Sequence, residues 1–303
     1  MADLKTPHSF MHPAPAADDG DPAKPVSRPA LRILFIFALT GLFACQEKTA
    51  SPTVSPSPDT VKTTEKKRDG SILPDGSSKK KIYLTFDDGP NKGTRNVLQI
   101  IREEQVPASF FVVAVHSTDT RQQKETWEIL RADSLIDRCN HSYSHARNRY
   151  NSYYENPAAV VEDFNQAQQL LGLSNRIART PGRNIWRIDS IRHTDIFESS
   201  MAADSLYAAG YDLMGWDIEW TFHHRTLRPD ADTGLLLRRI YNLLESGKTR
   251  TPGHLVLLAH DQAYQKETYL EELRYIIRQL KQNPAYQLEL ITRYPGIRKS
   301  REL

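Results

Sequence analysis

The sequence has few cysteines and almost no charge imbalance. Its two cysteines, Cys45 and Cys139, cannot form a disulfide framework. The 40 Lys and Arg residues nearly balance the 37 Asp and Glu residues, and a net charge of +3 gives no indication of nucleic-acid binding. No internal repeat is visible. A chain of 303 residues, 39% hydrophobic and 25% charged, suits a globular protein with one large domain or two small ones.

A long hydrophobic run is also missing. Residues 33–44 are apolar and uncharged, but a membrane-spanning helix needs roughly 20 such residues. With Arg28 and Arg32 before it, the run is typical of a signal peptide behind an N-terminal extension rich in Pro, Ala and Asp; a buried apolar helix is the alternative. The stretch "LFAC" resembles a bacterial lipobox, although Phe43 is larger than the residue usual there. This resemblance implies a lipid on Cys45 and a protein anchored to a membrane of the bacterial cell envelope, facing the periplasm or the exterior.

Residues 46–80 have the composition of a linker. Ser, Thr, Pro and Lys dominate this stretch, and apolar residues are nearly absent. Such a segment cannot bury enough surface to offset the entropy lost on folding. The sequence therefore predicts an N-terminal signal and lipobox segment at 1–45, a linker at 46–80 and a folded domain at 81–303.

From residue 81 onward, short apolar runs alternate with longer amphipathic stretches. Strands are predicted at 81–86, 108–115, 134–139, 176–179, 211–220, 253–260 and 286–292. Helices are predicted between them at 93–105, 123–133, 156–173, 201–210, 233–247 and 268–282. This alternation is typical of an α/β fold with a parallel sheet, open or closed into a barrel. Active sites of such folds lie at the carboxyl ends of the strands.

The ionisable side chains gather at those carboxyl ends. The first strand runs into "YLTFDDGP" and ends in Asp87 and Asp88, which by themselves could also form a surface Asp-Gly turn. The ends of the other strands carry His141 and His145, Arg179, the stretch "WDIEW", and His260 with Asp261. Because these ends share one edge of a parallel sheet, the sequence predicts a single site there.

His141 and His145 are the strongest indication of a metal. They are four residues apart, so a helical turn after the strand would place both imidazoles on one face. Two imidazoles and a carboxylate, with positions left for water, are typical of a catalytic zinc-like ion. A structural role is the better interpretation for the isolated His116 and His193. Cys139 could offer a thiolate, but a small buried apolar residue is the better interpretation.

Five stretches occur in the order of the motifs of a known family. "TFDDGP", "NHSYSH", "RTPG", "WDIEW" and "LVLLAH" resemble the five motifs of the polysaccharide deacetylase family, also called NodB-homology or carbohydrate esterase family 4. The resemblance extends over about residues 81–293. It implies a distorted (β/α) barrel of about seven parallel strands. It also implies metal-dependent hydrolysis of N-acetyl or O-acetyl groups on a cell-surface or extracellular polysaccharide, such as peptidoglycan or a chitin-like chain.

The resemblance implies a role for each matching residue. The metal, most simply zinc, would be held by Asp88, His141 and His145. Asp87 would be the general base and His260 the general acid. The two adjacent carboxylates would thus have different roles, and the cation would offset their repulsion.

Further residues would complete the site by the same resemblance. Arg179 would orient Asp87, and the backbone N–H of Gly182 would hold the oxyanion. Leu258 and Trp220 would form a small apolar pocket for the acetyl methyl group. Either Asp217 or Glu219 could pair with His260, and Glu219 is favoured because it directly precedes Trp220.

The third motif departs from the family pattern. An aromatic or small residue and then glycine usually follow the proline, whereas this chain has Pro181, Gly182, Arg183 and Asn184. One pocket wall is therefore not accounted for. We hypothesise that Arg183, with Arg187, His223, His224 and Arg225 around the same rim, favours glycans that carry carboxylates over neutral ones. The alternative is that Arg183 pairs with a nearby carboxylate such as Asp195 or Glu219.

Two other functions fit the same sequence. A zinc hydrolase of a non-glycan amide would keep the same metal site. A catalytically inactive glycan-binding lipoprotein would need neither Asp87 as a base nor His260 as an acid, and the presence of both speaks against it.

Overall fold

The computed structural model describes residues 79–298. The signal-peptide segment, the lipobox cysteine Cys45 and nearly all of the linker predicted at 46–80 lie outside the described residues. Within 79–298, no helix has both the length and the apolar character needed to cross a membrane.

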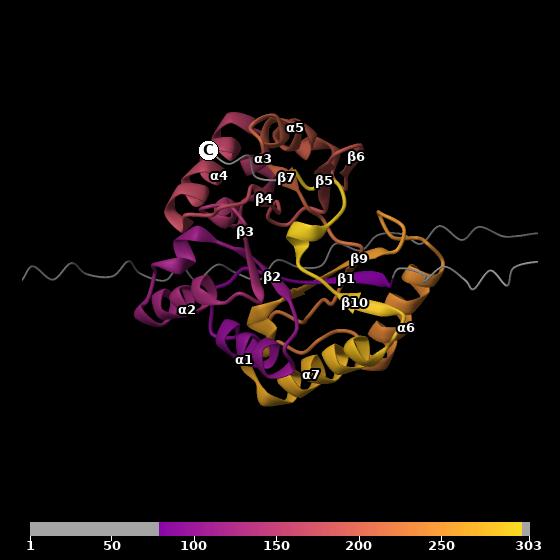
Figure 1. Cartoon of the computed structure of the whole chain (residues 1–303). Helices are drawn as coiled ribbons and strands as arrows, with labels where there is room; N and C mark the ends of the chain where they lie inside the picture. Colours follow the sequence, from indigo (N-terminus) through magenta and orange to yellow (C-terminus); the bar gives the residue numbers. More distant parts are fainter. Residues whose placement is uncertain (1–78, 299–303) are drawn as a thin grey trace, which may run out of the picture. The chain divides into compact units, whose positions relative to one another are not determined.

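The described residues form one mixed, mostly parallel sheet with helices around it (Figure 1). The strands are β1 (Lys80–Asp87), β2 (Ala108–Val112), β3 (Ile136–Asn140), β4 (Ile177–Ala178), β5 (Ile185–Ile188), β6 (Ile191–Thr194), β7 (Asp212–Leu213), β8 (Ile218–Glu219), β9 (His254–His260) and β10 (Tyr286–Leu288). Their order is β6-β5-β7-β4-β3-β2-β1-β9-β8, and β10 pairs with β1. Across residues 79–298, β6 and β8 end this path without pairing with each other, so the sheet curls into an open half-barrel.

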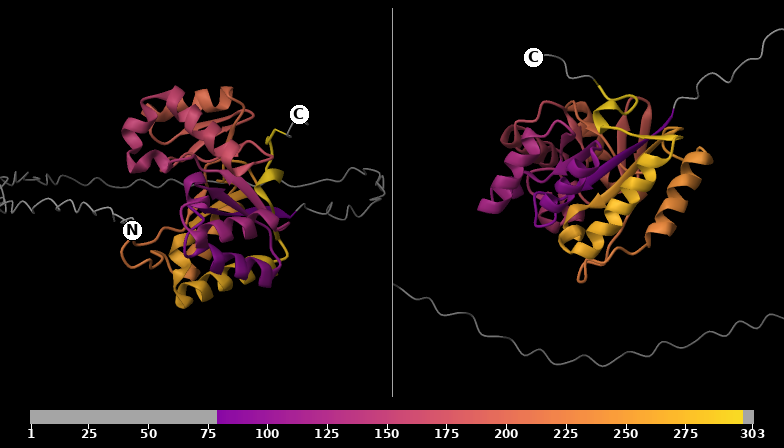
Figure 2. Two further views of the ribbon diagram at one scale, coloured as in Figure 1. Left: turned by 90° about the vertical axis from the view of Figure 1, so that its left-hand side faces the viewer. Right: turned by 60° about the horizontal axis from the view of Figure 1, so that its bottom comes forward.

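The helices lie outside the curled sheet, as the two views of Figure 2 show. They are α1 (Thr94–Glu104), α2 (Arg121–Ala132), α3 (Tyr150–Tyr154), α4 (Pro157–Leu171), α5 (Ser200–Ala208), α6 (Thr233–Glu245) and α7 (Glu267–Gln282). Helices α1 and α7 are far apart in sequence but adjacent in space, and Arg278 Nε joins Glu104 Oε1 across them at 2.8 Å. Apart from the short α3, each helix falls within a few residues of its predicted bounds, because each carries an apolar stripe at helical spacing.

The alternation of side chains along β1 separates two apolar layers. Ile82, Leu84 and Phe86 pack outward into the core beneath the helices. Tyr83 points to the other face, into a cluster inside the half-barrel that also contains Phe111 and the fully buried Cys139. With both faces covered, β1 is a nearly continuous apolar run, as expected of a central parallel strand. The same period of two directs Asp87 toward the interior.

The strand register brings the predicted site residues to one edge. Asp87 is paired directly with His260 on the neighbouring strand β9. On the other side of β1, β2 is followed by β3 and then β4, so His141 and Arg179 each begin the segment that leaves the next strand. Parallel pairing therefore places the ends of β1, β3, β4 and β9 next to one another.

The predicted strand at 211–220 is wrong as a single element. It is divided into β7, which pairs with β4, and β8, which pairs with β9 at the other end of the sheet. Residues 214–217 cross from β4 to β9 and therefore do not continue either strand ladder. Arg179 compensates by donating from Nε to Met214 O at 3.0 Å and from Nη2 to Gly215 O at 2.9 Å. A buried guanidinium thus satisfies backbone groups that a strand ladder would otherwise pair.

The antiparallel hairpin of β5 and β6 was not predicted. It lies between the third motif and α5, and its two-residue turn contains Asp189 with φ 47°. The available signal was weak: the apolar run of β5 precedes an Asp-Ser turn, but β6 has the sequence Ile-Arg-His-Thr with a single apolar residue.

Candidate active site

Both carboxylates of the first motif face one cavity at the carboxyl edge of the sheet. The cavity has a volume of about 200 Å³. Its lining residues are Asp87, Asp88, His141, His145, Tyr150, Thr180, Gly182, Trp216, Glu219, Leu258 and His260. Neighbouring residues of a regular strand would point to opposite faces. Asp88 escapes this alternation because its φ of 76° lies in the left-handed region, which turns the chain as the strand ends.

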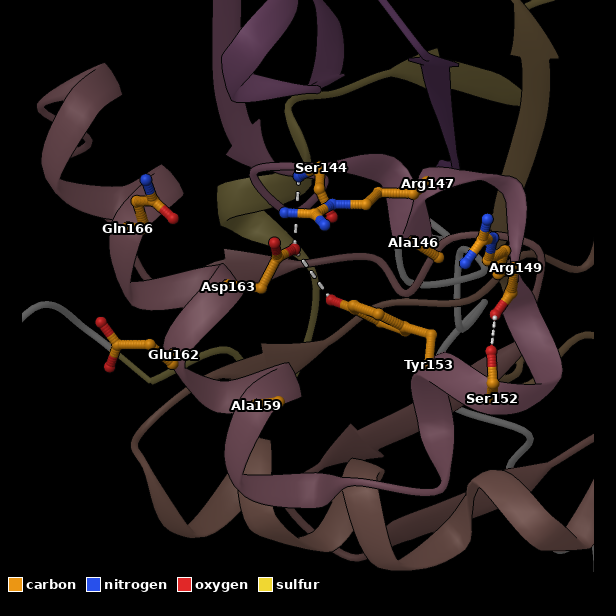
Figure 3. Close-up of a pocket in the computed structure, with 10 residues that line it drawn as sticks. All are labelled: Ser144, Ala146, Arg147, Arg149, Ser152, Tyr153, Ala159, Glu162, Asp163 and Gln166. Atoms are coloured by element: carbon orange, nitrogen blue, oxygen red, sulfur yellow. Dashed lines mark hydrogen bonds between the residues drawn. The ribbon is translucent and has the colours of Figure 1, made fainter.

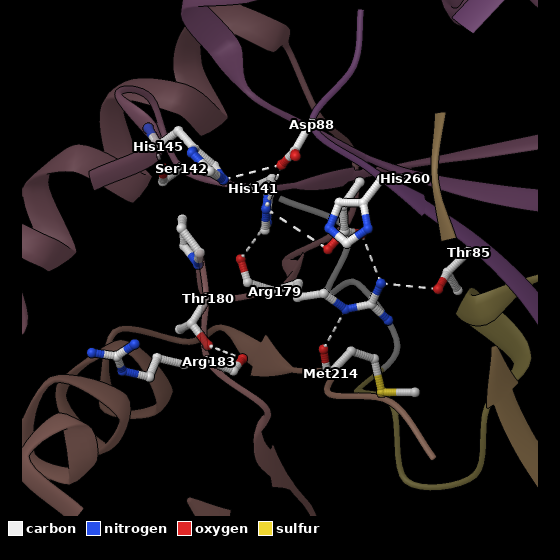
Figure 4. A network of polar contacts seen from close by, with 12 residues as sticks. Thr85, Asp88, His141, Ser142, His145, Arg179, Thr180, Arg183, Met214 and His260 are labelled. Carbon is white, nitrogen blue, oxygen red and sulfur yellow. Dashed lines mark hydrogen bonds and ion pairs between the residues drawn. The ribbon is translucent and has the colours of Figure 1, made fainter. Parts of the chain in front are cut away.

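Asp87 is held from below by Arg179. Both side chains are buried, and Arg179 Nη1 donates to Asp87 Oδ1 at 2.7 Å and to Thr85 Oγ1 at 2.9 Å. The guanidinium also stacks 3.9 Å from the ring centre of Phe111 (Figure 4 shows its surroundings). These contacts fix Asp87 in one orientation and leave Oδ2 as the oxygen that faces His141, 3.7 Å from its Nε2.

Asp88, His141 and His145 form a compact group of three metal-type ligands. One donor atom from each lies within 4.8 Å of the other two. Asp88 Oδ1 is 3.3 Å from Nε2 of His141 and 3.0 Å from Nε2 of His145, and Figure 4 shows the side chains converging. Burial acts to raise the pKa of Asp88, but the two imidazoles outweigh it and hold the pKa well below its usual value.

The orientation of His141 suits a metal ligand. Its Nδ1 lies 2.9 Å from the backbone carbonyl of Arg179, which can only accept, so Nδ1 carries the proton. The lone pair of Nε2 is then directed at the cavity, the arrangement usual for metal-binding histidines. Asp88 Oδ1 is buried and makes no well-aligned hydrogen bond with the described residues. An oxygen in that state beside two imidazoles is what a bound cation would satisfy.

The predicted helical turn between the two histidines is wrong. Ser142 has φ 71°, and residues 145 to 148 have φ of 50°, 55°, 47° and 56°, which makes a left-handed turn. Ser142 Oγ accepts from the backbone N–H of His145 at 3.0 Å. From the other side, Asp163 Oδ2 accepts from the N–H groups of Tyr143 and Ser144 at 3.2 and 3.3 Å. The two imidazoles are therefore brought together by these side-chain contacts and not by the spacing of a helical turn.

A second hollow lies behind this turn (Figure 3). It is lined by residues between Ser144 and Gln166. Asp163 is at its centre and also accepts from the hydroxyl of Tyr153 at 2.9 Å. The role of Asp163 is therefore to brace the loop that carries His145.

His260 lies opposite the metal-type ligands. Its ring packs against Phe222, with ring centres 5.5 Å apart, and its Nδ1 is 3.9 Å from Oε1 of Glu219. Burial raises the pKa of Glu219, while the positive charge of His260 acts in the other direction. Asp217, the other carboxylate considered for this pairing, instead accepts from the backbone N–H groups of Arg250 and Val256. Of the two, Glu219 is therefore the one beside His260.

The apolar wall contains a different tryptophan from the one predicted. Leu258 lines the cavity, two residues before His260 and on the same face of β9. Trp220 does not line it: the ring is buried in the outer core, and its Nε1 donates to Ala231 O at 2.9 Å. Because Glu219 faces the cavity, its neighbour must point away. Trp216 takes the position instead, held by Asn184, which accepts from its N–H at 3.1 Å and donates to its carbonyl at 2.9 Å.

The hypothesis that Arg183 forms a charged rim is wrong, and so is its pairing with Asp195 or Glu219. The side chain is only 6% exposed. Its Nε donates to Ser199 Oγ at 3.0 Å, Nη1 to Gly182 O at 2.9 Å and Nη2 to Asn151 Oδ1 at 3.0 Å. These three neutral acceptors hold the guanidinium inside the protein, away from a ligand in the cavity.

The other rim cations divide into two groups. Arg187 is also buried, bound to Asp204 at 2.6 Å and to backbone carbonyls of the β5–β6 hairpin. His223, His224 and Arg225 are exposed on the loop after β8. Gly182 is exposed and faces the cavity with φ 62°.

Sequence reasoning missed three lining residues: Tyr150, Thr180 and Trp216. Thr180 and Trp216 lie within the third and fourth motifs and could have been found there. Tyr150 lies on α3, beyond the second motif, in a stretch without a strand end or a motif, so no local signal marked it.

The family model that matches this chain and two of its curated relatives are all described as deacetylases of saccharides. A family model described as polysaccharide deacetylase matches residues 75–186. The chitin disaccharide deacetylase of Vibrio alginolyticus is 24% identical, over 46% of this chain and 47% of the relative. The chitooligosaccharide deacetylase of Rhizobium leguminosarum bv. trifolii is 51% identical, over 14% of this chain and 21% of the relative. The chain thus spans less than half the length of these curated relatives.

Solved structures share the fold. The catalytic domain of peptidoglycan N-acetylglucosamine deacetylase from Eubacterium rectale ATCC 33656 matches with a TM-score of 0.53 at 23% identity, over 74% of this chain and 95% of that chain. A Streptococcus mutans CE4 esterase matches with a TM-score of 0.52 at 22% identity, over 69% of this chain and 86% of that chain. The predicted α/β class, a distorted and mostly parallel barrel, is confirmed.

Proposed function

We propose that this chain, whose residues 75–186 match the polysaccharide deacetylase family model, hydrolyses acetyl groups from an acetylated polysaccharide. The observation that carries this proposal is the convergence of three metal-type ligands, an arginine-bound carboxylate and an opposing histidine on one cavity. A volume of about 200 Å³ is several times the roughly 30 Å³ of one water molecule, so an acetyl group and a water fit together.

The metal would be held by Asp88, His141 and His145. Two imidazoles and a carboxylate favour zinc, and three protein ligands leave positions for water and substrate. A bound cation would polarise the acetyl carbonyl and make water a stronger acid, and would neutralise part of the negative charge of the two aspartates.

Proton transfer is assigned to Asp87 and His260. Arg179 occupies Oδ1 of Asp87, so Oδ2 accepts the proton of the attacking water. As the carbon–oxygen bond forms, the backbone N–H of Gly182 donates to the oxyanion. His260 then protonates the leaving nitrogen, or the leaving oxygen of an O-acetyl ester, as its bond to the acetyl carbon breaks. Glu219 Oε1, 3.9 Å from Nδ1 of His260, lies on the side of the ring away from the leaving group and would orient the imidazole for this step.

The acetyl methyl group would lie between Leu258 and Trp216, the two apolar residues that line the cavity. The sugar that carries the acetyl group would lie at the mouth of the cavity. We infer an N-acetylglucosamine polymer as the substrate, since the two named relatives act on chitin disaccharide and chitooligosaccharide.

The test is release of acetate from N-acetylglucosamine oligomers by the purified full chain, before and after treatment with a chelator. We expect release that the chelator abolishes and added zinc restores. Activity that survives complete metal removal would contradict the metal site. Absence of activity on acetylated glycans, with full metal content, would contradict the proposed substrate class.

We also propose that a lipid on Cys45 anchors the protein to a membrane of the cell envelope. The apolar run at 33–44, the basic residues before it and the stretch "LFAC" support this. A lipoprotein carries several acyl chains, enough for firm anchoring. Cys45→Ser should move the protein from the membrane fraction to the soluble fraction or leave it uncleaved, and an unmodified Cys45 in the mature chain by mass spectrometry would contradict the proposal.

A further inference from the structure

Tyr150 occupies the cavity wall for which the third motif has no aromatic residue. It comes from α3, far from Pro181 in sequence, yet its ring lies directly over Gly182. A side-chain carbon at position 182 would be 3.1 Å from both Cδ1 and Cε1 of Tyr150. The ring also packs edge-on against His145, with ring centres 5.8 Å apart. Tyr150 is thus placed at the mouth of the cavity, between a candidate metal ligand and the candidate oxyanion donor.

Four contacts attach α3 to the third motif. Arg183 Nη2 donates to Asn151 Oδ1 at 3.0 Å, and its guanidinium carbon lies 5.9 Å from the ring centre of Tyr150 and 5.2 Å from that of Tyr154. The hydroxyl of Tyr154 donates to Pro181 O at 2.7 Å. The arginine that replaces the usual residue of the motif is therefore a buried support for the helix that presents Tyr150.

The hydroxyl group of Tyr150 makes no strong hydrogen bond with the described residues. Its hydroxyl contact, to Oδ1 of Asn148, is 3.4 Å long and therefore weak. The side chain is partly exposed, and Gly182 beside it is exposed. A partly exposed aromatic ring in the lining of a polar cavity matches the apolar C–H face of a pyranose ring.

We propose that Tyr150 is a substrate-contacting residue whose ring packs against the sugar that carries the acetyl group. This inference rests on the proposed function, since it takes the ligand to be an acetylated glycan. Tyr150 contributes binding through its ring and not through its hydroxyl, and it acts equally on the bound substrate and the transition state. Arg183 acts indirectly, as a positioning residue for Tyr150.

The rival interpretation is that Tyr150 only braces His145. Bracing predicts that removal of the ring weakens metal binding and lowers kcat. Sugar contact predicts a higher KM and a higher Kd at unchanged metal content, with kcat nearly kept. The two interpretations therefore differ in quantities that are measured separately.

The experiment measures binding and turnover of one probe, the N-acetylglucosamine tetramer. Binding is measured by calorimetry in the zinc-loaded full chain carrying Asp87→Asn, which we expect to consume the ligand at least about 10²-fold more slowly. Turnover is measured in the chain with Asp87 intact. Each background receives Tyr150→Ala, Tyr150→Phe or the control Tyr275→Ala, which removes a tyrosine that is 47% exposed on the outer helix α7.

We expect Tyr150→Ala to raise Kd and KM by about 3- to 10-fold, the range usual for loss of one aromatic contact, with kcat within about twofold. Tyr150→Phe and Tyr275→Ala should remain within about twofold of their parents. Unchanged Kd in Tyr150→Ala, loss of zinc in that variant, or no saturable binding to the parent would each overturn the inference. A tetramer that binds through Tyr150 but loses no acetate would overturn the proposed function and leave the inference standing.

Arg183→Met gives an independent readout through a double-mutant cycle. Each single substitution should raise KM. The double mutant Arg183→Met/Tyr150→Ala should raise KM by less than the product of the two single fold-changes, because both substitutions remove the same contact. Fully multiplicative effects would overturn the positioning role of Arg183.

Discussion

Replacing Asp87 by asparagine tests the assignment of the general base most directly. Arg179 Nη1 must find an acceptor on this side chain, since its bond to Asp87 Oδ1 is 2.7 Å long and both groups are buried. The amide oxygen of asparagine will therefore face Arg179. Its NH₂ group then takes the place of Oδ2, directed at the cavity and at His141, where it can donate but cannot accept a proton.

The expected loss of turnover is about 10²- to 10⁴-fold, the usual contribution of a positioned base. Stability should fall more modestly. Deleting one partner of a buried ion pair costs about 3–5 kcal/mol, and the retained hydrogen bond from Arg179 makes the loss smaller than that. Zinc content should be unchanged, because Asp87 is not one of the three converging ligands.

The assay combines acetate release, zinc content and thermal unfolding on one preparation of each protein. Asp204→Asn is the matched control: it also removes a carboxylate paired with an arginine, Arg187 at 2.6 Å, but its side chain is 65% exposed. If Asp87→Asn releases acetate at a rate within about tenfold of the parent, at equal zinc content, Asp87 is not the base. Loss of zinc would instead show that Asp87 is a metal ligand.

Three further predictions concern the metal, the third motif and a buried carboxyl group. His141→Ala should abolish stoichiometric zinc binding, measured by equilibrium dialysis, because two protein ligands rarely hold zinc; full occupancy would contradict the ligand assignment. Arg183→Met should lower the free energy of unfolding in urea by about 2–4 kcal/mol, since it removes three hydrogen bonds from a buried cation, and a change below about 0.5 kcal/mol would show that these bonds do not stabilise the fold. Burial raises the pKa of Asp261 to about 7, although Thr94 and Asn91 donate to it. The native carboxyl therefore keeps a proton that the unfolded chain loses near pH 4, so its contribution to stability is present below about pH 4 and is lost as the pH rises through 7. As the pH rises from about 4 to 7, the Tm of the parent should fall relative to the Tm of Asp261→Asn. Plots of Tm against pH that stay parallel for the two proteins would contradict the assigned pKa.

Much of the fold was accessible from the sequence. The apolar runs of β1 and β9 and the helical stripes of α1, α4 and α7 are local patterns, and their periods of 2 and 3.6 residues predict the elements directly. The 211–220 stretch failed because its two halves pair with opposite ends of the sheet, and pairing partners are not encoded in a local period.

For the site, the sequence by itself determined which chemical groups gather at the carboxyl edge. Parallel alternation alone places Asp87, His141, Arg179 and His260 there, whatever the details of the loops. It did not determine which way the side chains beyond the strand ends point, because torsions there are set by contacts with distant residues.

Only the tertiary structure decided those directions. A left-handed φ of 76° turns Asp88 into the same cavity as Asp87. The loop of His145 is fixed by two side-chain acceptors, the nearby Ser142 and Asp163 from α4. The pairing of β8 with β9 turns Glu219 inward and its neighbouring tryptophan outward. The burial of Arg183, which looked like a surface charge, follows from its contact with α3, a helix some thirty residues earlier in the chain. A local pattern specifies a residue's chemistry and its element, but a side chain's direction past the end of a strand depends on what packs against it.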